Sequence, residues 1–397
     1  MLLIAALPLF GQTFHYMKDL KPLWALSKAF PLLSLLLVLP VLTYRRVPQV
    51  FGWLLAFLWL VLVSSFAGVL TFDQNFLLGL TAQVKLLPML YALSFLGLLL
   101  LVRPSTDQLV KAIQVWAVLT FAAVFLLWAF APQSWYSTKY EFGDAPLLSV
   151  DDRGNRIRMP MYFGLIALFS LNRRLLAKPD LRTAVLFVFA LALIAGVVRT
   201  RAVVLGCVAT LALIAFMASS PRWRVVAVAA AAIVGFVLLQ VPYVQSAFDT
   251  SAASGIQLRQ ITADKSIAFL GDSVLRWMFG VGTITPLDPG GLPKFFNHFF
   301  FLADISWLGI VFEFGLVGAA IMLILLMRTW NYARRVRQSF NSPVLAGMQD
   351  YVLFTLIQSP LYSTMTLQPG EIAVVAAIFV YLAIMRRNVQ LRKPRPT

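Results

Sequence analysis

One histidine of this chain stands where it could do acid–base chemistry. The stretch KFFNHFFFLADIS, residues 294 to 306, places His298 among five phenylalanines, and the only other histidine is His15. An unperturbed imidazole has a pKa of about 6.5, so it can take a proton from a hydroxyl near neutral pH. Surrounding phenylalanines would lower the local dielectric and strengthen electrostatic contacts. His298 is therefore a candidate general base, and a structural histidine capped by a backbone group is the alternative.

Two arginines stand at the boundary between two apolar runs. The stretch GVVRTRAVVLG, residues 196 to 206, contains Arg199 and Arg201. Charged side chains at such a boundary either snorkel to the surface or face a partner or a polar cavity. A guanidinium stays charged and can hold two phosphate oxygens at once. The pair predicts an anion clamp, with snorkelling as the alternative.

A second basic group lies in a long polar segment. GIQLRQITADKSIAFLGDSVLRWMFGVG, residues 255 to 282, carries Arg259, Lys265 and Arg276 beside apolar residues. It predicts a surface helix followed by a glycine-containing turn. These cations could bind an anionic substrate, or they could face lipid phosphates as on many membrane-surface helices.

Other charged residues are weaker candidates. Asp151 and Asp152 could hold a divalent cation, but neighbouring arginines favour a solvated, self-neutralised loop. Lys85 and Glu313 fall inside apolar runs, where each could pair with a neighbour to fix packing. Two distant histidines and the single Cys207 offer no local zinc spacing. We expect neither a metal nor a cofactor.

The composition indicates what must position these residues. The 397 residues are 60% hydrophobic and 12% charged, and apolar runs of bilayer-spanning length recur throughout. We expect an all-α polytopic membrane protein forming one domain over residues 1–397. Twelve helices are expected, at about 1–14, 23–43, 50–70, 81–102, 109–131, 159–171, 183–198, 202–219, 223–241, 305–327, 346–364 and 371–385.

The distribution of lysine and arginine predicts the orientation. With twelve spans, one side holds more than half of the 33 basic residues, including the tail 386–397, and few acids. The positive-inside rule makes that side cytoplasmic, with both termini. The loops 132–158 and a large helical one at 242–304, between the ninth and tenth helices, are then extracytoplasmic. Topogenic charge explains most of the formal net charge of +17, so no nucleic-acid partner is expected.

The segments quoted above around His298, Arg201 and Arg259 contain three short motifs, and together these resemble the bacterial O-antigen ligase and O-antigen polymerase superfamily. The first is a histidine followed by a glycine-containing helix, HFFFLADISWLGIVFEFGLVGAA, with Gly315 and Gly318. The second is Thr200 with Arg201 at a span boundary. The third is Arg259 ahead of the GVG turn at 280 to 282. The layout of about a dozen spans with a large late loop is also similar.

The resemblance implies a function and a site. Members pass a glycan from undecaprenyl diphosphate to a sugar hydroxyl outside the cytoplasmic membrane, without nucleotide or metal. His298 would take the hydroxyl proton, while Arg201 and Arg259 stabilise the departing diphosphate. The diphosphate-binding residues expected here are Arg199, Arg201, Arg259, Lys265 and Arg276. A single displacement without a carboxylate nucleophile predicts inversion of the anomeric centre.

The identity of the acceptor separates two possible functions within this class. ADISWLG, after the histidine, is similar to some polysaccharide polymerases, and Asn297 precedes His298 where ligases commonly have an asparagine after it. This favours polymerisation onto a growing chain over ligation to lipid A core. A third reading is a flippase or transporter of lipid-linked glycan, which would need polar groups near the bilayer midplane. Membrane lipids are the remaining expected partners, and a bacterial inner membrane with a periplasmic site is the expected location.

Overall fold

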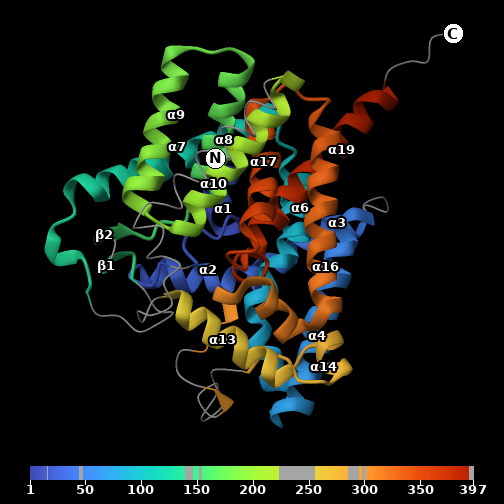
Figure 1. Cartoon of the computed structure of the whole chain (residues 1–397). Helices are drawn as coiled ribbons and strands as arrows, with labels where there is room; N and C mark the ends of the chain where they lie inside the picture. Colours follow the sequence, from blue (N-terminus) through green and yellow to red (C-terminus); the bar gives the residue numbers. More distant parts are fainter. Residues whose placement is uncertain are drawn as a thin grey trace.

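The computed structural model describes residues 1–15, 17–43, 48–138, 146–151, 154–222, 255–284, 295–296, 300 and 302–392. Within these residues the fold is a helical bundle with one small hairpin, as expected for an all-α chain (Figure 1). Helices satisfy their own backbone hydrogen bonds, which is what an apolar segment in lipid requires. The α-helices are α1 Leu2–Phe10, α2 Lys21–Leu33, α3 Leu39–Thr43, α4 Pro48–Phe72, α5 Phe76–Ala82, α6 Tyr91–Val102, α7 Thr106–Phe130, α8 Tyr162–Ala177, α9 Leu181–Leu193, α10 Arg201–Ala218, α13 Gly255–Leu270, α14 Val274–Phe279, α16 Ser306–Arg337, α17 Pro343–Gln358, α18 Thr364–Leu367 and α19 Pro369–Arg392.

Eight helical segments among the described residues are long and apolar enough to cross a membrane. This makes the protein a multi-pass membrane protein. The eight segments are Lys21–Thr43, Val50–Phe72, Phe76–Val102, Thr106–Phe130, Leu181–Val198, Arg201–Ala218, Leu302–Arg337 and Pro369–Arg387.

The other four expected spans are shorter or lie elsewhere. The first is α1, with only nine residues, and the sixth and eleventh are α8 and α17, with 16 residues each. At 1.5 Å per residue, a helix of 16 residues is about 24 Å long, below the roughly 30 Å of a hydrocarbon core. The ninth, 223–241, lies outside the described residues. The number twelve remains a prediction.

Three of the long apolar segments are interrupted. The 3₁₀ turn η2, Gln83–Leu90, joins α5 to α6. Helix α16 is broken at Gly315, where φ is 69° and ψ is 178°. The 3₁₀ helix η1, Ser34–Val38, separates α2 from α3 within Lys21–Thr43. These interruptions give the bundle irregular backbone inside otherwise apolar segments.

The core is formed by the C-terminal helices together with earlier helices, above all α6 and α8. Helix α17 packs along α8, and α19 packs along α6. A bidentate ion pair joins α8 to α17, with Arg173 Nε and Nη2 donating to the Asp350 carboxylate at 2.6 and 2.7 Å. The pair therefore fixes these two helices against each other within the largest buried cluster.

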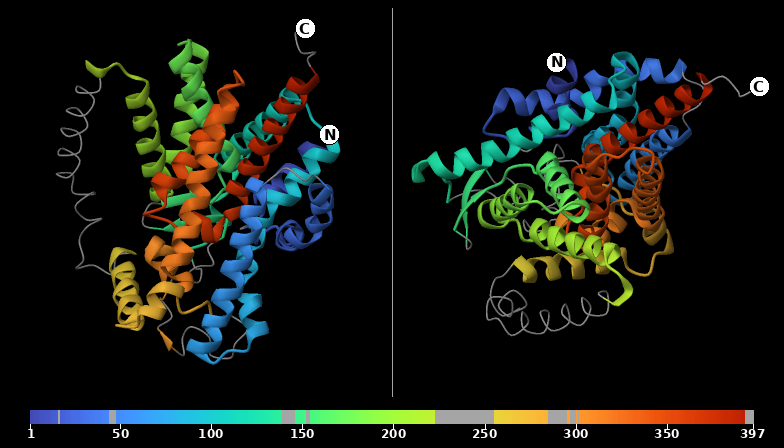
Figure 2. Two further views of the ribbon diagram at one scale, coloured as in Figure 1. Left: turned by 90° about the vertical axis from the view of Figure 1, so that its right-hand side faces the viewer. Right: turned by 90° about the horizontal axis from the view of Figure 1, so that it is seen from above.

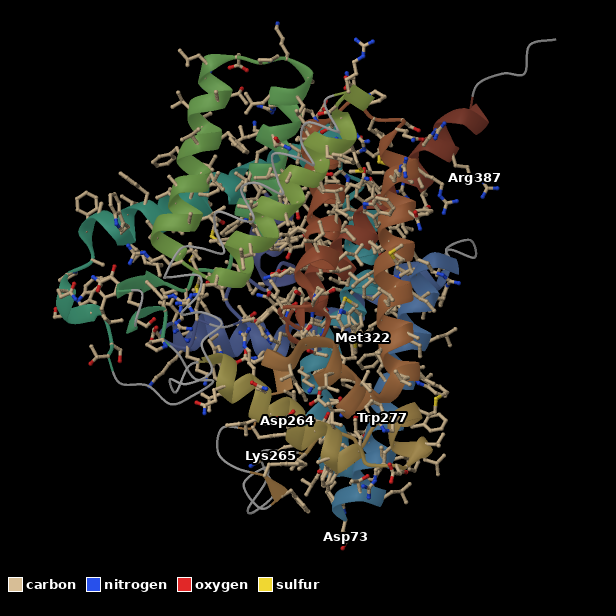
Figure 3. All side chains as sticks on the ribbon, viewed as in Figure 1. Asp73, Asp264, Lys265, Trp277, Met322 and Arg387 are labelled. Carbon is tan, nitrogen blue, oxygen red and sulfur yellow. The ribbon has the colours of Figure 1, made fainter. Side chains whose placement is uncertain are left out.

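The connections separate into two ends of the bundle. The α8–α9 turn and the end of α19 lie at the top in Figure 1, while α13 and α14 lie at the bottom. The side view of Figure 2 keeps this order. Figure 3 likewise places Arg387 at the top and Asp73, after α4, at the bottom. Strands β1 (Leu148–Asp151) and β2 (Gly154–Ile157) pair antiparallel, with Ser149 opposite Arg156.

Candidate functional site

His298 itself, with residues 297–299, lies outside the described residues, but the phenylalanines that flank it are placed. Phe296 and Phe300 stack with ring centroids 4.0 Å apart, and both rings meet Phe312 of α16 edge to face. Phe269 of α13 contacts Phe296 at 5.1 Å. The flanks of His298 are thus packed between α13 and the start of α16.

Arg259 is joined to the segment that follows the histidine. It projects from the first turns of α13, and its Nη2 lies 3.7 Å from Asp304 Oδ1. Asp304 belongs to the 3₁₀ turn η5, Leu302–Ile305, six residues after His298. The Arg259 side chain is 42% exposed, so the pair is loose enough for the guanidinium to exchange its partner for another anion.

Arg201 begins a helix. It is the first residue of α10, is exposed, and follows Thr200, which is in extended conformation. The orphan amides and macrodipole of a helix N-terminus favour an anion beside it. Arg199 adopts the left-handed region with φ 52° and donates from Nε to Gly196 O at 2.6 Å. This turn places both arginines at the lower end of α9 and α10.

The hairpin supplies an arginine that the sequence analysis assigned to a solvated loop. Arg156 on β2 is only 3% exposed and donates from Nη2 to Thr200 Oγ1 at 3.1 Å. A Cβ on Gly154 would lie 3.1 Å from Arg199 Nη1. Strand β2 therefore covers the 199–201 turn. Hairpin formation between residues distant from that turn carries no local sequence signal, which is why Arg156 was missed.

The remaining expected anion contacts are placed differently. Lys265 is exposed on α13. Arg276 donates to Phe269 O at 2.8 Å, and its guanidinium lies 5.3 Å from the Phe269 ring centroid. These contacts tie α14 to α13, with Gly271 in the turn between them at φ 53°. Arg276 thus has a structural partner on the expected surface helix.

The site residues form two groups in the described part of the chain. One is the arginine turn, which we define as Arg156 and residues 199–201. The other is the loop unit, which we define as α13, α14 and residues 302–314. Helix α13 lies below the end of α10 where Arg201 begins the helix, in Figure 1 and in the side view of Figure 2. Both groups are therefore on the same end of the bundle.

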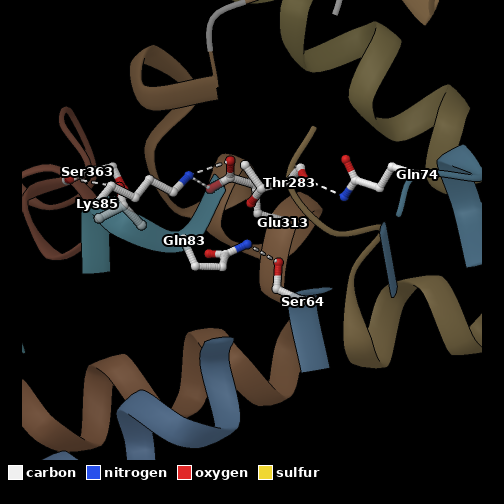
Figure 4. A network of polar contacts seen from close by, with 8 residues as sticks. Ser64, Gln74, Gln83, Lys85, Thr283, Glu313 and Ser363 are labelled. Carbon is white, nitrogen blue, oxygen red and sulfur yellow. Dashed lines mark hydrogen bonds and ion pairs between the residues drawn. The ribbon is translucent and has the colours of Figure 1, made fainter. Parts of the chain in front are cut away.

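A polar network lies behind the loop unit. Lys85 Nζ is 2.6 Å from both Glu313 carboxylate oxygens, and Figure 4 shows this pair between η2 and α16. Gln83 Nε2 donates to Ser64 Oγ at 2.9 Å, and Gln74 Nε2 donates to Thr283 O at 2.9 Å. The two buried charges that the sequence singled out are thus each other's partners.

A scan of protein-family models and a search of curated proteins find no match to this chain.

Proposed function

We propose that the protein is an inverting, metal-independent glycosyltransferase that moves a glycan from undecaprenyl diphosphate onto a sugar hydroxyl. The reaction would take place on the periplasmic face of the bacterial inner membrane during surface polysaccharide assembly. The acceptor is the growing chain in the favoured polymerase version. Ligation of finished O-antigen to lipid A core is the alternative within the same chemistry.

The observation that carries this proposal is the contact between Arg259 and Asp304. It links Arg259 of α13 to Asp304, which follows His298 by six residues in the sequence. A general base and an anion-binding guanidinium on one packed unit are the two groups that the reaction requires. The aromatic cluster of Phe269, Phe296, Phe300 and Phe312 gives that unit an apolar side.

The proposed step is a single displacement. The acceptor oxygen bonds to the anomeric carbon while the bond from that carbon to the diphosphate oxygen breaks. His298 takes the hydroxyl proton, and the electron pair of the broken bond leaves on undecaprenyl diphosphate. Arg259 and Arg201 stabilise the negative charge that builds on the phosphate oxygens. Arg156 holds the turn from which Arg201 projects.

Transport of a lipid-linked glycan is the second candidate, and one specific observation favours it. Polar groups lie inside the spans, including the partly buried Lys85–Glu313 pair and the buried Glu371, which accepts a hydrogen bond from Tyr351 Oη. Interrupted helices around buried polar groups are common at transporter sites. Transport would leave linkage chemistry independent of His298.

Reconstitution tests these alternatives. Purified protein in vesicles is given undecaprenyl-diphosphate-linked repeat units, with and without lipid A core, in the presence of a chelator. Wild type is compared with His298→Ala, Arg201→Ala and Arg259→Ala. His15→Gln and Arg387→Ala serve as controls, because neither residue belongs to the arginine turn or to the loop unit, and Arg387 lies at the opposite end of the bundle from Asp264 and Lys265.

Each result has a defined reading. A ladder without lipid A core, lost in the three site variants and kept in the two controls, supports a polymerase using this site. Product that requires lipid A core supports the ligase. We expect loss of the base to lower the rate by about 10²- to 10⁴-fold. Full activity in His298→Ala, or no product from folded wild type, contradicts the proposal and favours transport.

A further inference from the structure

The residues that follow α14, beginning at Gly280, pack against the backbone of α16 where that helix is broken. Both Gly280 and Gly315 have positive φ, 79° and 69°. A Cβ on Gly315 would lie 2.2 Å from Met278 O, and one on Gly280 would lie 2.6 Å from Glu313 C. Val281 N donates to Phe312 O at 2.8 Å. Only glycine fits this crossing, so the backbone itself links the two halves of the loop unit.

An ion pair stands directly at this crossing. Glu313 is two residues before Gly315, and its carboxylate receives both contacts from Lys85 Nζ. The side chains of Lys85 and Glu313 are 28% and 9% exposed. Desolvating two charges costs free energy that apolar packing would not. The pair therefore calls for a role beyond holding the helices together.

The rest of the segment 302–314 has anchors of its own. Asp304 contacts Arg259, Ser306 Oγ donates to Ser359 O, and Trp307 Nε1 donates to Ser359 Oγ at 2.9 Å. Without the ion pair the segment would stay attached at these points. Because α16 is broken at Gly315, helix continuity does not fix the orientation of this segment relative to the rest of α16. The ion pair is thus placed to set orientation at the break.

We propose that Lys85 and Glu313 are positioning residues: their ion pair fixes residues 302–314 against η2 and so orients Asp304 and the segment that follows His298 in the sequence. This inference rests on the proposed function, because it assigns the pair a purpose in that reaction. Neither residue is placed against substrate. Their effect passes through the backbone on the two sides of Gly315.

The kinetic test separates positioning from packing. Glu313→Gln and Lys85→Met should lower kcat about 10²-fold, the cost of a shift of about 1 Å in reacting groups. The donor KM should change little, because the arginines that bind the diphosphate remain. The exchanged pair, Lys85→Glu with Glu313→Lys, should restore most of the loss. Loss of activity without rescue by the exchanged pair would overturn the proposal.

The Arg173–Asp350 pair provides a matched control. It is also a close ion pair between two helices, with side chains 23% and 1% exposed, and it lies on α8 and α17 outside the loop unit. Asp350→Asn should destabilise the protein while leaving kcat of the folded fraction unchanged. An equal fall in kcat in Glu313→Gln and in Asp350→Asn would mean that breaking either ion pair between helices lowers kcat. That result would overturn a specific positioning role for the Lys85–Glu313 pair.

A second measurement does not depend on activity. Spin labels on Asp264→Cys of α13 and Leu70→Cys of α4 report the distance between the loop unit and the bundle; the native Cys207 is buried. We expect Glu313→Gln to broaden this distance distribution and the exchanged pair to narrow it again. An unchanged distribution would overturn the inference. If wild type makes no product while the distribution still responds, the proposed reaction fails and the mechanical role of the pair stands.

Discussion

The arginine that begins α10 and the arginine of α13 are held in different ways. Arg201 projects from the first turn of α10, which Arg156 holds through Thr200. Arg259 shares a long contact with a partly exposed carboxylate. In the proposed reaction, Arg201 would meet the diphosphate with help from the helix dipole, while Arg259 would leave Asp304 to do so. We therefore expect Arg201 to be the more preorganised of the two.

His15 gives a prediction about pH at the residue scale. It is buried beside Lys28, whose Nζ lies 2.9 Å from His15 Nε2. Burial, with the Lys28 charge adding to it, lowers the pKa of His15 to about 3. The unfolded chain takes up a proton near pH 6.5, and the folded chain does not. The contribution of His15 to stability should therefore be constant above about pH 6.5 and fall by roughly 1.4 kcal/mol for each pH unit below it, until about pH 3.

The measurement is the thermal midpoint of unfolding in detergent at pH 7 and at pH 5. Wild type should lose more stability between these values than His15→Gln, which has no such group to titrate. Carboxylates common to both proteins cancel in the comparison. Equal losses in wild type and variant would show that His15 is not held neutral in the folded state.

At the element scale, the broken helix α16 depends on glycine. Gly315→Ala should destabilise the protein, because alanine strains a backbone at φ 69° by about 1–3 kcal/mol and its Cβ meets Met278 O. Gly52 is the control. It lies in α4 with no atom within 4 Å of a built Cβ, so Gly52→Ala should be neutral or should stabilise by up to about 1 kcal/mol.

Thermal unfolding of both purified variants checks this prediction. A Gly315→Ala protein as stable as Gly52→Ala would mean that α16 is a continuous helix through residue 315. The break that separates residues 302–314 from the rest of α16 would then be absent as well. Both variants add one methyl group to a glycine. The difference between their stabilities therefore reports the effect of the local backbone conformation and contacts.

The helices and the surface helix of the loop could be predicted from local pattern, whereas the partners across the bundle could not. Apolar runs alone locate α4, α7 and α10, because a span must satisfy its backbone hydrogen bonds internally. Lys85 and Glu313 are 228 positions apart, so their pairing depends on how α16 folds back onto η2. In the sequence, each residue was notable only as a charge in an apolar run, and this pattern does not identify its partner.

Length criteria explain why the number of spans was harder to predict. Helices α8 and α17 are hydrophobic enough to look like spans but have 16 residues each. They pack against each other in the buried core. Composition cannot distinguish a short helix buried in protein from a span in lipid, because both require apolar side chains.

At the scale of the whole molecule, a group of basic residues marks one end of the bundle. Arg174 and Lys178 lie at the end of α8 that meets α9, and Arg334, Arg335 and Arg337 end α16. Arg387 lies at that same end in Figure 3, while Asp264 and Asp73 lie toward the other. By the positive-inside rule we propose that the basic end faces the cytoplasm and that α13 with the loop unit lies outside.

Cysteine accessibility in intact cells tests this orientation. Lys178→Cys, in the α8–α9 turn, should react with a membrane-impermeant thiol reagent only after the membrane is opened. Asp272→Cys, in the turn after α13, should react once the outer barrier is permeable and the inner membrane is intact. Both positions are exposed, and the native Cys207 is buried, so the background should be low. The reverse pattern would place α13 and Arg259 in the cytoplasm, on the side where a periplasmic glycan acceptor is absent, and the proposed reaction could not then use this site.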